Sequence, residues 1–113
     1  MPIVNLTRKT FLADSVETAD TSLKRMRGLL GRGSIKPGEA LVIPQCKSIH
    51  MFFMKFAIDV VFLDENNKVV GLKERIKPFA VSPVFWKSSC AVELPVGTIK
   101  GTGTQVGDQI QIN

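Results

Sequence analysis

Short apolar segments, separated by turn-forming residues, dominate the chain. Strand-like patterns occur at residues 3–6 and 15–18, and from residue 40 onward they recur at 40–43, 48–56, 58–64, 69–76, 89–94 and in an alternating segment that ends at residue 112. The polar run at residues 65–68 predicts a turn that joins its two flanking strands into a hairpin. Six to eight short strands at this spacing are typical of a β-sandwich or a small barrel.

One segment has the period of a helix instead of a strand. Residues 20–22 (Asp-Thr-Ser) can begin a helix, and two glycines, Gly31 and Gly33, can end it. Between them, apolar residues recur three or four positions apart: Leu23, Met26, Leu29 and Leu30. We therefore predict a single domain over residues 1–113 that is mainly β (α+β by strict count). It is a compact β-sandwich or barrel-like fold with one short amphipathic helix near residues 21–30.

Composition and charge narrow the class of protein. The chain has 113 residues, of which 44% are hydrophobic, and no apolar run approaches the ~20 residues that a membrane span requires. The first twenty residues lack the continuous apolar core of a signal peptide, which predicts a cytoplasmic protein or a mature form whose leader has been removed. The first 36 residues carry a net charge of +4, out of +5 for the whole chain. Such a basic patch can attract nucleic acid or an acidic partner, or simply keep the surface soluble.

The segment from Ser48 to Asp64 contains the main candidates for chemistry. It includes the only histidine, His50, and a lone acid, Asp59, within apolar sequence; Glu93 is similarly isolated in a later strand. Isolated polar groups of this kind must be paired or functional, because burying an unpaired charge costs several kcal/mol. In the simplest case each carboxylate binds a backbone N–H group or a nearby base. In a hydrolase, His50 would be the base and Asp59 or Glu93 would orient it.

A metal site is disfavoured. Cys46 and His50 have half of a zinc-ligand pattern, but in an extended strand their backbones would lie ~13 Å apart, too far for one ion. With two cysteines and one histidine the supply of ligands is small, so we predict no metal and no cofactor. Two cysteines do not make a disulfide framework, and the sequence leaves open whether Cys46 and Cys90 lie close together.

Two further motifs have structural explanations beside functional ones. Gly107-Asp108 suits a tight turn, in which glycine accepts a positive φ and aspartate closes the turn with its own side chain. Phe79, Phe85 and Trp86 lie in a proline-bounded loop at residues 77–88. These aromatic residues either fix the loop to the core or form the lip of a pocket or a contact surface.

Several of these motifs together resemble a known family, the domain of unknown function 192, which comprises small uncharacterised prokaryotic proteins. The matching pieces run from about residue 5 to 112: Arg27-Gly28-Leu29-Leu30 with Arg32, Ile49 to Met54, Ile58 to Asp64, Glu93-Leu94-Pro95 with Gly97, and Gly107-Asp108. The resemblance implies a β-sandwich or barrel-like fold with a helix near its start, and it supplies no reaction. It also implies that the polar residues on these motifs are the ones to follow: Arg27, Arg32, His50, Asp59, Glu93 and Asp108. Ala57 departs from the pattern, because many members have proline there, and this chain lacks the export leader that many relatives carry.

The resulting functional hypothesis is a ligand- or partner-binding β domain without catalysis. Its candidate site combines six polar residues: Arg27, Arg32, His50, Lys55, Asp59 and Glu93. The three basic side chains of this set, Lys55 and the two arginines, would fix an anionic group, and the others would set its orientation. The alternatives are the hydrolase built on His50 and nucleic-acid binding through the basic N-terminal third. The expected partner is a small molecule or a protein; nucleic acid is disfavoured, no membrane is expected, and the chain would be a monomer or a weak dimer.

Overall fold

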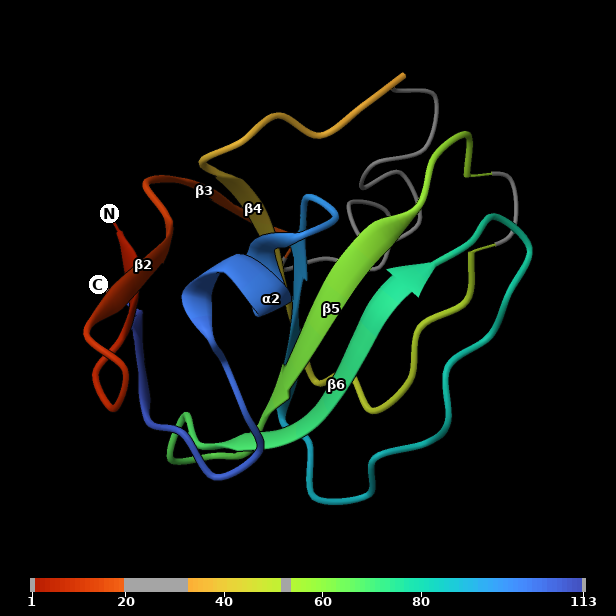
Figure 1. Ribbon diagram of the computed structural model, residues 1–113. Helices are drawn as coiled ribbons and strands as arrows, with labels where there is room; N and C mark the ends of the chain where they lie inside the picture. Colours follow the sequence, from red (N-terminus) through yellow and green to blue (C-terminus); the bar gives the residue numbers. More distant parts are fainter. Residues whose placement is uncertain (1, 20–32, 52–53, 113) are drawn as a thin grey trace.

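The structure is a computed structural model, and it describes residues 2–19, 33–51 and 54–112. Two β-sheets form the architecture, and neither closes into a barrel (Figure 1). The smaller sheet has the order β2-β1-β8, with bounds β1 (Ile3–Asn5), β2 (Thr10–Ala13) and β8 (Ile110–Ile112). The larger sheet has the order β3-β4-β7-β5-β6, with bounds β3 (Ser15–Thr18), β4 (Glu39–Pro44), β5 (Ile58–Leu63), β6 (Val69–Ile76) and β7 (Cys90–Leu94). All pairings are antiparallel except that of β3 with β4. These two sheets confirm the mainly-β prediction.

The larger sheet has a hydrophobic cluster on each of its faces. One cluster lies between the sheets and includes Ile3 of β1, Val61 of β5 and Ile99 of the short helix α2 (Thr98–Thr102). The other lies beneath loops that cover the opposite face, and it includes Phe62 and Met51. Strand β5 is buried along its whole length because alternate residues enter the two clusters. The molecule therefore has three layers: the small sheet with α2, the large sheet, and a layer of loops.

The prediction of a strand at residues 48–56 is wrong for the part of it that the structure describes. There His50 makes only a single antiparallel bridge with Val81, and no strand is formed. Ile49, Met51 and Met54 belong to a loop, but their side chains pack against the sheet in the hydrophobic cluster. Because they are buried at nearly alternate positions, their sequence pattern resembles that of a strand. The hairpin of β5 and β6 is confirmed. Strand β2 and helix α2 were not predicted, and the helix predicted near residues 21–30 lies outside the described residues.

A buried polar network joins the two ends of the chain. Asp108 Oδ2 accepts hydrogen bonds from Asn5 Nδ2 (3.0 Å), Arg8 Nε (3.0 Å) and the backbone N–H of Gln105 (2.9 Å). Gly107 has a φ of 96°, so this turn has the geometry that its sequence predicts. Asp108 closes this turn through Gln105 and forms a salt bridge with Arg8, so its role is structural.

Candidate functional site

Asp59 is fully buried and is used to hold the chain together. Its Oδ2 accepts hydrogen bonds from the backbone N–H groups of Gly97 (3.1 Å) and Ile99 (3.0 Å), and its Oδ1 accepts one from that of Arg75 (3.0 Å). Asp59 thereby fixes the first turn of α2 and the end of β6 to the middle of the sheet. These bonds match the structural reading of an isolated buried acid, and none of them involves His50.

Glu93 lies on the other face of the same sheet. It is opposite Leu41 of β4 and Val60 of β5, whereas Asp59 is opposite Leu94, so the two acids point to opposite sides. The Glu93 side chain is 7% exposed and accepts no hydrogen bond from any described residue. Burial raises the pKa of Glu93 to about 7. A carboxyl group in this setting exchanges its proton near neutral pH, as the functional acids of many binding and catalytic sites do.

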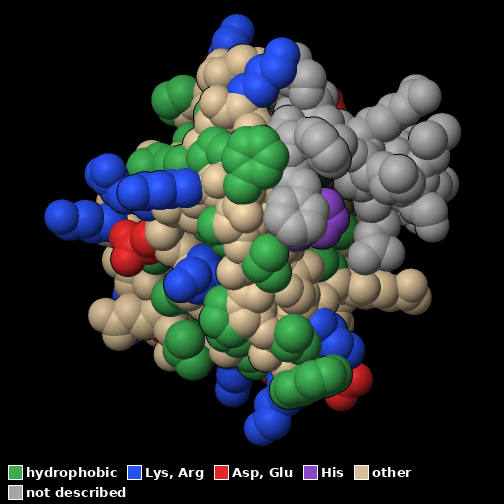
Figure 2. Space-filling model, turned by 90° about the vertical axis from the view of Figure 1, so that its right-hand side faces the viewer, with side chains coloured by type: hydrophobic (Ala, Val, Ile, Leu, Met, Phe, Trp, Pro, Cys, Tyr) green, Lys and Arg blue, Asp and Glu red, His purple; other side chains and the backbone are tan. Residues whose placement is uncertain are grey.

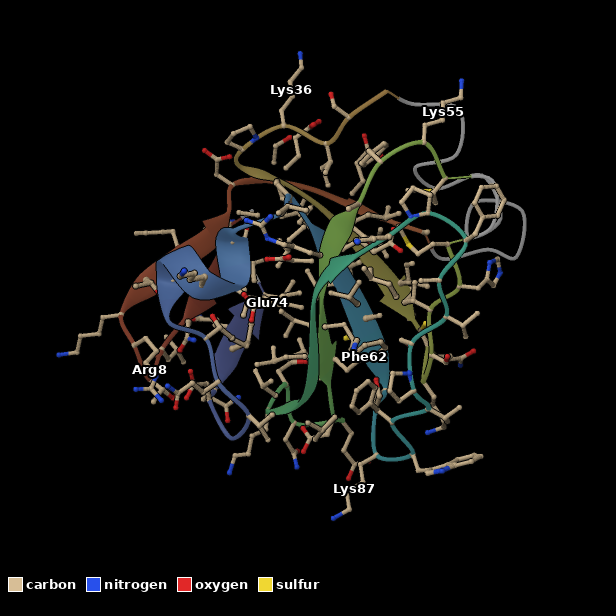
Figure 3. All side chains as sticks on the ribbon, turned by 45° about the vertical axis from the view of Figure 1, so that its right-hand side comes forward. Arg8, Lys36, Lys55, Phe62, Glu74 and Lys87 are labelled. Carbon is tan, nitrogen blue, oxygen red and sulfur yellow. The ribbon has the colours of Figure 1, made fainter. Side chains whose placement is uncertain are left out.

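His50 and Lys55 lie on the outside of the loop layer. Both are exposed, and Lys55 points into solvent at the end of the molecule where β5 begins (Figure 3). Among the hydrogen bonds given for the described residues, none joins His50 to Asp59 or Glu93 as the hydrolase hypothesis requires. Arg27 and Arg32 lie outside the described residues, as do two more of the N-terminal bases, Lys24 and Arg25.

The two cysteines do not form a disulfide. Cys46 is buried and donates to the backbone carbonyl of Ser48 (3.1 Å). Burial, and to a smaller extent the charge of Cys46, raise the pKa of Cys90 to about 11, so its thiol is protonated and poorly nucleophilic at neutral pH. Within the part of the chain that the structure describes, no three His, Cys, Asp or Glu side chains gather closely enough to bind a metal ion.

A separate depression of about 570 Å³ lies between β6 and α2, on the Asp59 side of the sheet. Glu74 points into this region from β6 (Figure 3). Its other lining residues are Arg75, Ile99, Lys100, Gly103, Thr104 and Gln105. The charged side chains at this depression are exposed, and Asp59 beneath it is already satisfied by backbone donors. Glu93 thus differs from Asp59 in that none of the hydrogen bonds among the described residues reaches its carboxyl group.

The double loop over the Glu93 face carries surface residues that the sequence did not single out. We use this name for residues 45–57 and 77–89, apart from residues 52 and 53, which are not described. Its backbones are joined by hydrogen bonds such as Met51 N–H to the Ala80 carbonyl (2.8 Å) and Phe85 N–H to the Lys47 carbonyl (2.7 Å). Val81 and Val84 are exposed here beside Phe79 and Trp86. No sequence signal distinguishes an exposed valine from a buried one in an irregular segment.

Comparison with known sequences defines the family. The DUF192 family, described as "Uncharacterized ACR, COG1430", matches residues 3–112. A UPF0127 protein of Thermococcus sibiricus is 35% identical over 112 residues, which cover 96% of this chain and 72% of that protein. A UPF0127 protein of Pyrococcus furiosus is 34% identical over 117 residues, covering 98% of this chain and 97% of that protein. This chain therefore belongs to the uncharacterised DUF192 (UPF0127) family, as its motifs predict.

Two crystal structures have the same fold. A protein of unknown function from Novosphingobium aromaticivorans superposes with a TM-score of 0.85 at 19% identity, covering 99% of this chain and 84% of that chain. A protein from Sinorhizobium meliloti, provisionally called a transcription regulator, gives a TM-score of 0.83 at 20% identity over 97% of this chain and 89% of that chain. At these identities the likeness concerns the fold alone. Among the described helices, none has the length and apolarity needed to cross a bilayer.

Proposed function

We propose that this protein is a ligand-binding domain without a catalytic step, and that its site is centred on Glu93. The observation that carries the proposal is a carboxyl group that is 7% exposed and has no donor among the described residues. Burial without a partner destabilises the ionised form, so such a group reduces the stability of the free protein. A ligand that donates a hydrogen bond to this carboxyl group would offset that cost.

The surroundings of Glu93 suggest the chemistry of that ligand. Leu41 and Val60 lie opposite Glu93 on the neighbouring strands, so its surroundings are apolar, and the double loop that covers this face carries His50 and Lys55 on its outer side. A ligand with an ammonium or amide donor would satisfy Glu93, and an anionic group on the same ligand would be attracted by the bases outside. We therefore infer a small zwitterionic or amide-bearing molecule, such as an amino acid or a short peptide.

Thermal-shift measurements on the purified protein test this proposal. The probes are amino acids, di- and tripeptides, simple amines, sugars and nucleotides, each at pH 6 and pH 8. We expect a donor-bearing probe to raise the melting temperature, more strongly at pH 8 because Glu93 is then ionised. The Glu93→Gln variant should abolish the pH dependence and most of the shift.

Glu74→Gln is the matched control, because Glu74 is an exposed acid at the depression beside α2. A shift that persists in Glu93→Gln and disappears in Glu74→Gln would move the site to that depression. The absence of a shift with every probe would refute a small-molecule site at Glu93.

The hydrolase hypothesis has less support from the structure. It requires a hydrogen bond between His50 and a carboxylate, and Asp59 and Glu93 do not provide one. Binding to nucleic acid through the N-terminal bases depends mainly on residues 20–32, which lie outside the described residues.

A further inference from the structure

The double loop presents an unusual surface of apolar and basic side chains. Half of the large hydrophobic side chains that are exposed in the described part of the chain fall within residues 79–86. They are Phe79 (66% exposed), Val81 (58%), Val84 (46%) and Trp86 (78%). This concentration on one segment is more than the scattered exposure that is normal for a soluble protein.

The charged side chains of the double loop itself have a single sign. The sequence of the double loop contains four lysines, Lys47, Lys55, Lys77 and Lys87, and no acidic residue. Lys47 Nζ lies 2.8 Å from the backbone carbonyl of Trp86, which places an ammonium group directly beside the most exposed apolar residue. Figure 2 shows hydrophobic side chains distributed over this face, with the visible acidic side chains at its edges. A partner of this surface must therefore be both anionic and able to accept apolar side chains.

We propose that the double loop binds the surface of an anionic lipid bilayer. Tryptophan and phenylalanine prefer the level of the lipid headgroups, and lysines beside them are attracted to acidic lipids. The sequence predicts no membrane partner because it contains no spanning segment, but peripheral contact of this kind requires none. The contact shares Lys55 with the proposed ligand site, but it does not involve Glu93, which is buried on the face of the sheet beneath the loop layer.

Two other occupants fit the surface less well. A second copy of the chain would bring the same four lysines face to face, and like charges would repel each other. Single-stranded nucleic acid is also anionic, but it is bound by aromatic side chains that stack on its bases. The exposed valines at positions 81 and 84 cannot stack, whereas the interface of a bilayer accepts aliphatic and aromatic side chains alike.

The chain provides its own reporter for a test. Trp86 is the only tryptophan and there is no tyrosine, so the emission of the protein reports directly on the proposed contact. The full chain is titrated with vesicles of phosphatidylcholine alone and with vesicles containing 30% phosphatidylglycerol. We expect a blue shift of Trp86 emission and co-sedimentation only with the anionic vesicles. Both signals should weaken when salt is raised from 0.1 to 0.5 M.

Surface variants separate the apolar and the electrostatic contributions. Because one lysine near an acidic membrane changes the partition coefficient about fivefold, the double variant Lys77→Gln/Lys87→Gln should reduce it about thirtyfold. Phe79→Ala should reduce binding and leave Trp86 available as the reporter. The matched controls are Lys9→Gln/Lys36→Gln and Phe11→Ala, which alter exposed residues of the same types on other parts of the molecule. These controls, and Glu93→Gln, should bind within about twofold of the parent.

Three results would overturn the proposal. The first is the absence of a blue shift and of co-sedimentation with anionic vesicles. The second is an equal loss of binding in the control variants, which would mean attraction by net charge alone. The third is quenching of Trp86 by oligo(dT) at concentrations below those at which vesicles bind, which would assign the surface to single-stranded nucleic acid. Circular dichroism of each variant checks that the fold is retained.

Discussion

At the scale of single residues, two buried acids on neighbouring strands have opposite roles. Asp59 points toward α2 and receives three backbone hydrogen bonds, whereas Glu93 points to the loop-covered face and receives none from the described residues. The strands place them one register position apart, and the alternation of side chains separates them by the thickness of the sheet. The same residue chemistry thus gives a structural anchor on one face and, on the other, a carboxyl group to which the described residues donate no hydrogen bond.

The raised pKa of Glu93 predicts how stability depends on pH. Its folded-state pKa of about 7 lies above the ordinary value of 4.5, so folding takes up a proton between these values. The free energy of unfolding should fall as pH rises from 4.5 to 7 and then become level, by an amount on the order of 3 kcal/mol. Glu93→Gln should remove this fall and gain about 1–2 kcal/mol at pH 8, since a buried amide also lacks partners.

Urea unfolding at pH 4.5, 6 and 8 measures this effect, with Glu74→Gln as the exposed control. If the two variants show the same pH dependence as the parent chain, Glu93 is not the group that titrates.

At the scale of elements, one aromatic residue fixes the double loop to the sheet. The Phe85 ring packs on Phe62 of β5 with centroids 4.5 Å apart, and it also covers Gly71 of β6. A Cβ atom at Gly71 would overlap the Phe85 ring, so the absence of a side chain at this position makes room for the loop. The sequence left two explanations for the aromatic residues of this loop. Phe85 fixes the loop to the core, as the first explanation has it, whereas Phe79 and Trp86 are exposed.

Gly71→Ala should displace Phe85 and loosen residues 77–89 from the sheet. The expected cost is about 1–3 kcal/mol, because an added methyl group in a filled site forces its neighbours to move. Limited proteolysis should show faster cleavage within this loop. Gly101→Ala is the control: beyond its chain neighbours and its own helix backbone, no atom lies within 4 Å of the added Cβ. Because alanine also favours the helix, this variant should be equally or more stable than the parent. Equal proteolysis of both variants would contradict the role of Phe85.

At the scale of the whole molecule, the network around Asp108 holds the first and last strands together. Hydrogen bonds from Arg8, Asn5 and the backbone of Gln105 lower the pKa of Asp108, although desolvation opposes this effect. A lowered pKa stabilises the folded chain above the ordinary value of 3.8, and this contribution is lost as pH falls through the folded-state pKa. Through Asp108, the free energy of unfolding should therefore fall as the solution is acidified below the ordinary pKa of 3.8. Through Glu93, it should fall instead as pH rises from 4.5 to 7.

Asp108→Asn should destabilise the protein by about 2 kcal/mol at pH 7, because charge-assisted hydrogen bonds are replaced by weaker ones. It should also make the stability less sensitive to acid below pH 4. Hydrogen exchange followed by mass spectrometry should show faster exchange in β1 and β8 than in β5. Uniformly faster exchange throughout the chain would mean that the network has no local effect on the termini.

The sequence by itself determined the class of fold, the β5–β6 hairpin, the turn at Gly107-Asp108 and the family, because each depends on local periodicity, turn chemistry or contiguous motifs. It also identified Asp59 and Glu93 as isolated acids. Only the tertiary structure decided that they face opposite ways, since the direction of a side chain depends on which neighbours its strand acquires. The loop at residues 48–56 was indistinguishable from a strand for the same reason: its apolar residues pack onto a sheet formed by distant segments, and that contact has no local signal.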